Sequence, residues 1–423
     1  MAGNVNVINS FNEDTKSMKI EQVWKDLAIP IGKKIVYVIM DGLGGLGDSI
    51  SGETELQVAH TPNLDHLAKQ SSCGLLETVG PGITPGSGPG HLALFGYDPF
   101  KWTIGRGILS ALGIDFSLQE GDIAARINFA AKDDQGSIID RRAGRIDDKT
   151  NHRLCNKILS HINLKINGEI YLKTVSEHRA VLILRGKGLG GDITDTDPQR
   201  TNVPPLNPEA RDEASQKTVD LIINFIAQVE EILSVEEKAN TILLRGFEKY
   251  SPIPSINDRF GLSGLCVAEY PMYRGLSRLL GMELTESPTG LEAAFEQFRH
   301  SYLDAGDKDF FFFHIKDTDS NGEDGDFSRK VEILENIDHL MPLIFNVHPD
   351  VLVITADHST PATMGKHSWH PVPVLIHSEF SRVDDVHAFN ESACLHGSLG
   401  IRPGLHLMGL SLAHAGRLKK YGA

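Results

Sequence analysis

Apolar residues are grouped along the chain in short runs that predict buried strands. Near-continuous apolar runs, rich in β-branched or aromatic residues, cover 33–40, 309–315 and 351–356, and a further run covers 372–376. Strands buried on both faces of a parallel sheet have this composition, because neither face meets water. A helix is expected to begin at Thr61-Pro62, with the threonine as its cap and the proline in its first turn.

The pattern changes between about 115 and 300. Short alternating runs cover 122–129, 180–185 and 241–245, and they are separated by a Pro-rich loop at 203–208 and a long helical pattern at 209–233. Because the buried-strand pattern returns afterwards, we expect a smaller α/β domain inserted into a larger one. The expected division is an N-terminal extension at 1–32, a discontinuous core at 33–118 and 301–423, and an inserted domain at 119–300.

Composition and charge limit the classes of function. The 423 residues include 41 Lys and Arg against 56 Asp and Glu, so the formal net charge is −15. This balance argues against binding of a nucleic-acid backbone. Four scattered cysteines suggest reduced thiols, and neither a signal peptide nor a membrane-spanning run is evident. We therefore expect a cytoplasmic protein without a nucleic-acid or membrane partner; the oligomeric state stays open.

One serine lies in a segment with almost no side-chain bulk. Ser87 stands within Pro85-Gly86-Ser87-Gly88-Pro89-Gly90-His91, and an apolar helix pattern follows at 92–95. Glycines permit a sharp, exposed turn that would present the hydroxyl to a substrate. Taken alone, the segment is also compatible with a plain surface turn. A serine nucleophile needs an activating partner, and the sequence contains no evident Gly-x-Ser-x-Gly elbow.

Three of the apolar runs are followed by carboxylates: Asp41, Asp319 and Asp357. Each one alone could be a turn or a helix cap. However, the carboxyl ends of neighbouring parallel strands meet at one edge of a sheet, and three carboxylates gathered there would repel one another. Divalent cations relieve this repulsion, and His358 and His367 could supply imidazole ligands. With Ser87 added, the set predicts a two-metal site for displacement at phosphorus.

Together these segments resemble the cofactor-independent phosphoglycerate mutases of the archaeal type, which are members of the alkaline phosphatase superfamily. The resemblance covers nearly the whole chain from Lys33 onward, in the order in which the family has its motifs. The matching segments are Met40-Asp41-Gly42, Thr61-Pro62-Asn63-Leu64-Asp65, Pro85-Gly86-Ser87, His91 with Leu92-Ala93-Leu94-Phe95-Gly96-Tyr97-Asp98-Pro99, Gly105-Arg106-Gly107, Asp140-Arg141-Arg142-Ala143-Gly144-Arg145, Glu177-His178-Arg179, Asp195-Thr196-Asp197-Pro198, Thr355-Ala356-Asp357-His358-Ser359-Thr360-Pro361 and His367.

The resemblance implies an alkaline-phosphatase-like α/β core, with a mostly parallel sheet and helices on both faces, and an inserted phosphotransferase domain. It also implies two divalent ions. One ion would be bound by Asp41, Ser87, Asp357 and His358, and the other by Asp319, Glu323 and His367. Where Glu323 stands, the family has histidine. An additional carboxylate favours Mn²⁺ or Mg²⁺, with Zn²⁺ or Co²⁺ also compatible. Asp324 or Asp326 could replace it as the ligand.

The implied reaction is interconversion of 3-phosphoglycerate and 2-phosphoglycerate in glycolysis and gluconeogenesis, through a phosphoserine and without 2,3-bisphosphoglycerate. Ser87 would be the nucleophile, and Asp140 a candidate for proton transfer. Arginines suit a substrate that carries both carboxylate and phosphate. The expected substrate contacts are Arg141, Arg142, His178, Arg179, Arg245 and Arg274, the last at a position where the family tends to have lysine.

Two alternatives remain open at this stage. The departures at Glu323 and Arg274 are also compatible with a metal-dependent phosphatase, phosphonate hydrolase or sugar-phosphate mutase on the same core. A catalytically impaired homologue with a binding or regulatory role is the other. Release of free phosphate without isomer formation would identify the enzyme of the first kind. Absence of bound metal and of activity would identify the impaired homologue.

Overall fold

The predicted apolar runs lie side by side in one eight-stranded sheet of the computed structural model, which describes residues 20–422. The strand order is β13-β2-β12-β11-β1-β10-β8-β9, and only the β11–β12 and β12–β2 pairs are antiparallel. The strands are β1 (Ile35–Met40), β2 (Ser72–Glu77), β8 (Gly264–Val267), β9 (Glu283–Leu284), β10 (Phe310–Ile315), β11 (Val351–Thr355), β12 (Val372–Ser378) and β13 (Gly400–Pro403). The predicted α/β class with a mostly parallel sheet is confirmed.

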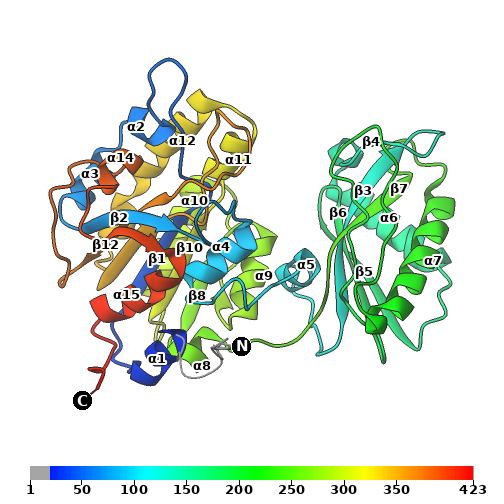
Figure 1. Ribbon diagram of the computed structural model, residues 1–423, viewed down its shortest axis with the longest axis horizontal. Helices are drawn as coiled ribbons and strands as arrows, with labels where there is room; N and C mark the ends of the chain where they lie inside the picture. The colour runs from blue at the N-terminus through cyan, green and yellow to red at the C-terminus, as the bar shows by residue number, and fades with distance from the viewer. Residues whose placement is uncertain (1–19, 423) are drawn as a thin grey trace, which may run out of the picture.

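Helices cover both faces of this sheet (Figure 1). Helices α4 (Ser87–Leu94) and α15 (Leu407–His414) contact each other on one face, whereas α10 (Leu291–Leu303) and α12 (Phe327–Leu340) contact each other on the other. The remaining helices around the sheet are α2 (Glu55–Val58), α3 (Pro62–Ala68), α8 (Ile256–Phe260), α9 (Pro271–Leu279), α11 (Asp317–Glu323), α13 (Pro342–Phe345) and α14 (Glu391–Cys394). Every residue of β1, β10 and β11 is buried, as expected for strands covered on both sides.

The pairing of the central strands determines where the predicted carboxylates lie. Strand β1 pairs in parallel with both β10 and β11, so the three strands end at the same edge of the sheet. Asp41 and Asp357 follow β1 and β11, and Asp319 lies in the first turn of α11, which begins just after β10. The chain therefore brings these three side chains together at the strand ends, where open α/β sheets bind ligands.

Two glycines allow the loops at this edge to approach closely. Gly42 has φ +64°, and a Cβ there would lie 2.5 Å from Thr360 Oγ1 and 2.8 Å from Asp319 Oδ1. A Cβ on Gly90 would lie 2.5 Å from the carbonyl oxygen of Asp357. Any larger residue would push α4 and the loop after β1 away from the carboxylates.

A second, five-stranded sheet lies apart from the first in Figure 1. Its described pairs are all antiparallel. The elements are β3 (Ile123–Lys132), β4 (Ile138–Asp140), β5 (Gly168–Ser176), β6 (Arg179–Gly186) and β7 (Thr241–Lys249), with α6 (Asp148–His161) and α7 (Gln216–Leu233). Helix α5 (Arg106–Gly113) contacts β3, β6 and β7 as well as α9, so it connects the two parts.

The strand pairing favours an end of the insert before the expected residue 300. Strand β8 pairs with β10, and β9 pairs with β8, so both strands belong to the larger sheet. Helix α10 also contacts β10. We therefore propose that the inserted part ends near Lys249, where β7 ends. Strands β8 and β9 are short and lack the long apolar runs that identify the other core strands.

The described part of the predicted N-terminal extension packs against the core; its residues 1–19 lie outside the described range. Helix α1 covers Ile20–Leu27. Its Trp24 packs so closely on Gly409 of α15 that a Cβ on this glycine would lie 2.2 Å from the tryptophan ring. Glu21 is buried and lies 2.9 Å from Arg259 Nη2. Among the described residues, no helix has the length and apolar character to cross a membrane.

Glu248 at the end of β7 predicts a pH dependence of stability. Burial raises the pKa of Glu248 to about 7, although the backbone N–H of Gly105 donates to its carboxylate. The folded protein therefore holds a proton that the unfolded chain releases near pH 4.5, so stability is lost as the pH rises from about 4.5 through 7. We expect Glu248→Gln to remove this loss.

The measurement is the free energy of unfolding by denaturant at pH 5 and pH 8. Between pH 5 and pH 8, the free energy of unfolding of Glu248→Gln should rise by about 2 kcal/mol relative to that of wild type. One pKa unit corresponds to about 1.4 kcal/mol, and partial solvation of the side chain reduces the effect. Glu209→Gln, at an exposed glutamate in the same part of the chain, serves as the control. Equal pH profiles for the Glu248 variant and wild type would contradict the assignment.

Candidate metal centre and active site

The two carboxylate oxygens of Asp41 have different partners. Oδ2 accepts a hydrogen bond from the Tyr273 hydroxyl and lies 3.0 Å from Lys316 Nζ. Oδ1 is buried without a hydrogen-bond donor among the described residues and lies 3.2 Å from His358 Nε2. Burial alone would raise the pKa of Asp41, but Lys316 and the neighbouring imidazoles lower it well below its usual range. The carboxylate is therefore ionised.

His358 has one ring nitrogen free to act as a ligand. The Thr360 hydroxyl donates to Asp319 Oδ1 at 2.6 Å and lies 3.0 Å from His358 Nδ1. Because this hydroxyl has only one proton, it accepts from Nδ1–H, which leaves Nε2 unprotonated. Nε2 lies 3.2 Å from both Asp41 Oδ1 and Asp357 Oδ2. Burial lowers the pKa of His358 despite these carboxylates, so the ring is neutral.

Asp319 and His367 form a second group with His358, and Glu323 lies beside it. His367 Nδ1 donates to the carbonyl oxygen of Pro85 at 3.1 Å, so its Nε2 is the unprotonated nitrogen. That Nε2 lies 3.4 Å from Asp319 Oδ1 and 3.7 Å from Glu323 Oε1. The rings of His358 and His367 stack with centroids 3.7 Å apart, which places the two groups next to each other.

The donor atoms of both groups fit divalent cations. Asp41, Asp357 and His358 offer ligand atoms within 4.8 Å of one another, and so do Asp319, His358 and His367. Asp357 Oδ2, like Asp41 Oδ1, is a buried carboxylate oxygen that accepts no hydrogen bond in the described structure, although His91 Nδ1 lies 3.2 Å away. Buried carboxylate oxygens are costly unless a cation or donor compensates them. Mixed carboxylate and imidazole ligands suit Mn²⁺, Mg²⁺, Zn²⁺ or Co²⁺.

Ser87 is the first residue of α4, with Gly86 at the N-cap. Its Oγ lies 3.4 Å from His358 Nε2, beside the first group. His91, one turn further along α4, donates from Nδ1 to the carbonyl oxygen of Ser87 at 2.8 Å, and the same nitrogen lies 3.2 Å from Asp357 Oδ2. His91 thus holds the serine turn against the carboxylates. The N-terminus of a helix also favours negative charge at Ser87.

A group of arginines lies on the second sheet. Arg141 forms a bidentate pair with Asp197, with nitrogen–oxygen distances of 2.8 Å and 2.7 Å. Arg245 lies 3.4 Å from the same carboxylate and 3.7 Å from Asp195. The negative charge of Asp197 therefore balances part of the positive charge of Arg141 and Arg245, two of the arginines predicted to contact the substrate.

Arg126 has no carboxylate partner of this kind among the described ion pairs. Arg126 stands opposite Arg245 in the β3–β7 register, and its Nε has no hydrogen-bond partner in the described structure. Burial together with Arg106 and Arg245 lowers the pKa of Arg126 to about 9. The pKa of His178 falls to about 3 through burial and the nearby Arg179, Arg142, Arg126 and Arg145. This concentration of positive charge would attract an anion.

Arg274 and Asp140 have other partners. The guanidinium of Arg274 donates to the carbonyl oxygens of Ala268 at 3.2 Å and Thr285 at 3.0 Å, next to the larger sheet. The carboxylate of Asp140 accepts from the backbone N–H groups of Arg142 at 2.7 Å and Gly144 at 2.6 Å. Their roles in substrate binding and proton transfer stay predictions.

Comparison with known proteins identifies the family. The model of the 2,3-bisphosphoglycerate-independent phosphoglycerate mutase family matches residues 68–239. A protein of Thermus thermophilus named as a probable mutase of this kind is 47% identical over 96% of this chain and 100% of its own length. The chain belongs to the 2,3-bisphosphoglycerate-independent phosphoglycerate mutase family. The family expected from the sequence is thus confirmed.

Two further comparisons agree with the family and the fold. A Deinococcus radiodurans protein with the same name is 46% identical over 94% of this chain and 98% of its own length. The solved structure of a cofactor-independent phosphoglycerate mutase from Thermoplasma acidophilum superposes with a TM-score of 0.64 at 28% identity, covering 90% of this chain and 100% of that chain. The fold is therefore that of this mutase family.

Several residues of the site were not among the sequence predictions. Lys316, Tyr273 and Thr360 contact the carboxylates, and Arg106 and Arg126 belong to the arginine group. Arg126 had a signal, because it is the one charged residue in a mostly apolar strand pattern at 123–131. For the others, the partners are distant in sequence, and only the fold brings them together.

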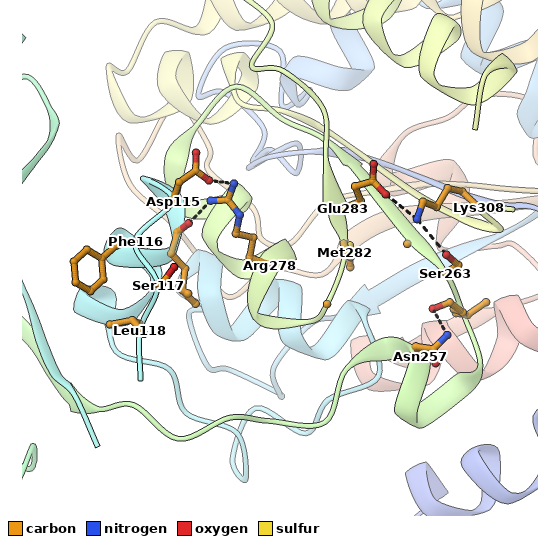
Figure 2. A pocket seen from close by; sticks show the side chains of 14 residues that line it. Asp115, Phe116, Ser117, Leu118, Asn257, Ser263, Arg278, Met282, Glu283 and Lys308 are labelled. Carbon is orange, nitrogen blue, oxygen red and sulfur yellow. Dashed lines mark hydrogen bonds and ion pairs between the residues drawn. The ribbon is translucent and has the colours of Figure 1, made fainter. Parts of the chain in front are cut away.

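One large cavity lies outside both candidate metal-binding groups. Figure 2 shows this cavity of about 670 Å³, which residues 115–118 line together with residues next to α8, α9 and β9. Arg278 pairs with Asp115 and donates to the carbonyl oxygen of Leu112 at 2.7 Å, and Lys308 lies 2.8 Å from Glu283. Both cations are already paired with carboxylates, so the described residues that line this cavity offer no unpaired cation to an anionic substrate.

We expect metal removal to lower the melting temperature. A ligand that binds only the folded state stabilises it by about 2.7 kcal/mol at one hundred times its dissociation constant. Protein treated with chelator should therefore melt several degrees lower than protein with added Mn²⁺, as measured by calorimetry. Asp357→Asn should lose most of the Mn²⁺-dependent increase.

Asp134→Asn, at an exposed position of the second part, is the control and should respond to Mn²⁺ as the wild type does. A melting temperature that does not change with Mn²⁺, Mg²⁺, Co²⁺ or Zn²⁺ would contradict the metal assignment.

Proposed function

We propose that this protein interconverts 3-phosphoglycerate and 2-phosphoglycerate by transferring the phosphoryl group to and from Ser87, without 2,3-bisphosphoglycerate. The observation that carries the proposal is the position of Ser87 Oγ, 3.4 Å from His358 Nε2 at the start of α4. It lies next to two buried carboxylate oxygens, Asp41 Oδ1 and Asp357 Oδ2, that accept no hydrogen bond in the described structure. Membership of the mutase family supports it independently. No observation favours a phosphatase or an impaired homologue over this function.

Two divalent ions would complete the site. We assign one ion to Asp41, Ser87, Asp357 and His358, and the other to Asp319, Glu323 and His367, with Mn²⁺ or Mg²⁺ preferred because carboxylates predominate. When bound, the ions would stabilise the negative charge that develops on the phosphoryl oxygens. Glu323 is half exposed, with 54% of its side chain accessible, so it can turn toward an ion without repacking.

Ser87 provides the nucleophile in this scheme. Its hydroxyl attacks phosphorus in line, forms the phosphoserine and releases glycerate, which later accepts the phosphoryl group on its other hydroxyl. The N-terminus of α4 and the brace from His91 orient the serine for both steps. The site must exclude water in the interval, because water would hydrolyse the phosphoserine.

The second sheet would retain the glycerate. Arg106, Arg126 and Arg179 line a small cavity together with Tyr270 and Met272, so groups from both parts of the chain surround it. We propose that these arginines bind the carboxylate and phosphate of the substrate, and that the two parts approach each other during turnover. Arg142, His178, Arg245 and Arg141 belong to the same positively charged face, and Asp140 is the proposed proton-transfer group.

Ser87→Ala tests the nucleophile. We expect kcat for conversion of 3-phosphoglycerate to fall more than about a thousandfold, because no phosphoserine can form. The assay follows 2-phosphoglycerate and free phosphate with Mn²⁺ present and without 2,3-bisphosphoglycerate. Ser234→Ala, at an exposed helix end, is the control.

Two results would contradict the function. One is near-normal turnover by Ser87→Ala, and the other is release of phosphate by the wild type without formation of 2-phosphoglycerate. A wild type that depends on 2,3-bisphosphoglycerate would also contradict the proposed phosphoserine route.

Arg126→Met tests the anion site. Loss of one charge-assisted hydrogen bond to the substrate should raise KM for 3-phosphoglycerate about ten- to hundredfold. Steady-state kinetics of the purified variant measure this change. Arg153→Met is the matched control, because Arg153 is an exposed arginine of α6 that pairs with Glu236 at 2.7 Å. Equal KM values for the two variants would contradict the assignment.

A further inference from the structure

Lys316 connects the two metal-binding groups. It stands at the N-cap of α11, directly after β10, and its Nζ lies 3.0 Å from Asp41 Oδ2 and contacts Asp319 Oδ2. Asp41 belongs to one group of candidate metal ligands and Asp319 to the other. One ammonium group therefore holds a carboxylate from each site.

The lysine and the histidines use opposite oxygens of these carboxylates. Asp41 Oδ1 lies 3.2 Å from His358 Nε2, and Asp319 Oδ1 lies 3.4 Å from His367 Nε2. Both Oδ2 atoms instead point to Lys316. Lys316 therefore does not occupy the oxygens that face the histidines, and those oxygens can bind metal ions. The lysine holds the carboxylates from the opposite side.

We propose that Lys316 is a positioning residue that fixes Asp41 and Asp319 relative to each other and thereby makes the two metal sites one preorganised unit. The inference rests on the metal sites of the proposed function. It concerns how ions are bound, and it assigns Lys316 no contact with the reacting atoms.

Two physical effects support this role. Hydrogen-bonded partners behind metal-ligating carboxylates set their orientation, and their loss typically weakens metal binding 10- to 100-fold. In addition, the ammonium separates two carboxylates that would otherwise repel each other across the site. Lys316 Nζ forms ion pairs with both carboxylates, and the side chains of Asp41 and Asp319 are 0% and 1% exposed.

Other contacts restrict the lysine to this position. Only 27% of its side chain is exposed, and Nζ lies 5.8 Å from the ring centroids of both Tyr270 and Tyr273. Tyr273 itself donates to the same Asp41 oxygen and stacks on His314 at 3.6 Å. The stem of Lys316 therefore has little freedom to carry Nζ elsewhere.

The test is direct titration of metal-free protein with Mn²⁺, followed by calorimetry and by the electron paramagnetic resonance signal of free Mn²⁺. We expect Lys316→Met to weaken binding of both ions at least about tenfold, because one residue holds a ligand of each. Lys316→Arg should stay within about threefold of wild type, since a guanidinium also spans two carboxylates. Lys308→Met is the control, because Lys308 is a similarly buried lysine whose partner is Glu283.

The outcomes separate the possible roles. A purely structural role would lower the melting temperature of Lys316→Met and leave its Mn²⁺ affinities unchanged, which would overturn the proposal. Tighter Mn²⁺ binding would also overturn it, because the lysine would then compete with the ions. If the methionine variant does not fold, Lys316→Gln is measured instead, with the same expected loss.

This test is independent of the reaction. A wild type that binds two Mn²⁺ ions but makes no 2-phosphoglycerate would contradict the proposed function and leave the role of Lys316 open to the same titration. Conversely, an active wild type with unchanged affinities in Lys316→Met would contradict only the inference about the lysine.

Discussion

The burial of several carboxylates side by side is the constraint on which the structure depends. Asp41, Asp319 and Asp357 are each 0–1% exposed and lie at the ends of strands that neighbour one another. Like charges at such separations in a low-dielectric site are unfavourable unless cations balance them. Lys316 balances part of this charge, and the unprotonated nitrogens of His358 and His367 leave room for divalent ions.

The rest of the larger part maintains this arrangement. Lys330 of α12 is fully buried and donates to the carbonyl oxygens of Gly42 at 3.0 Å, Gly44 at 3.3 Å and Thr360 at 2.8 Å. These carbonyls belong to the loops that follow Asp41 and His358, so one helix residue holds both loops in place. The Thr360 hydroxyl then links Asp319 to His358 and fixes the tautomer of the imidazole. Preorganised ligands of this kind bind ions without the cost of rearrangement.

The sequence was most informative where local composition determines structure. The apolar runs at 33–40, 309–315 and 351–356 correspond to β1, β10 and β11, since such runs are stable only when covered on both faces. Their pairing then brings together the predicted Asp41, Asp319, Asp357, His358 and His367. Contacts between distant segments were harder to predict from the sequence, because the residues next to Lys316 and Arg126 do not reveal the partners of these side chains. The end of the insert that we propose, near Lys249, differs from the expected residue 300, because the short strand β8 at Gly264–Val267 has no long apolar run that would identify it as a core strand.

The most direct test of this account is anomalous diffraction at the manganese edge from crystals soaked with Mn²⁺. The account predicts two peaks about 4 Å apart, one within bonding distance of Asp41, Asp357, His358 and Ser87, and the other of Asp319, His367 and Glu323. Density for only one ion, or for ions outside this cluster with Ser87 remote from both, would contradict it.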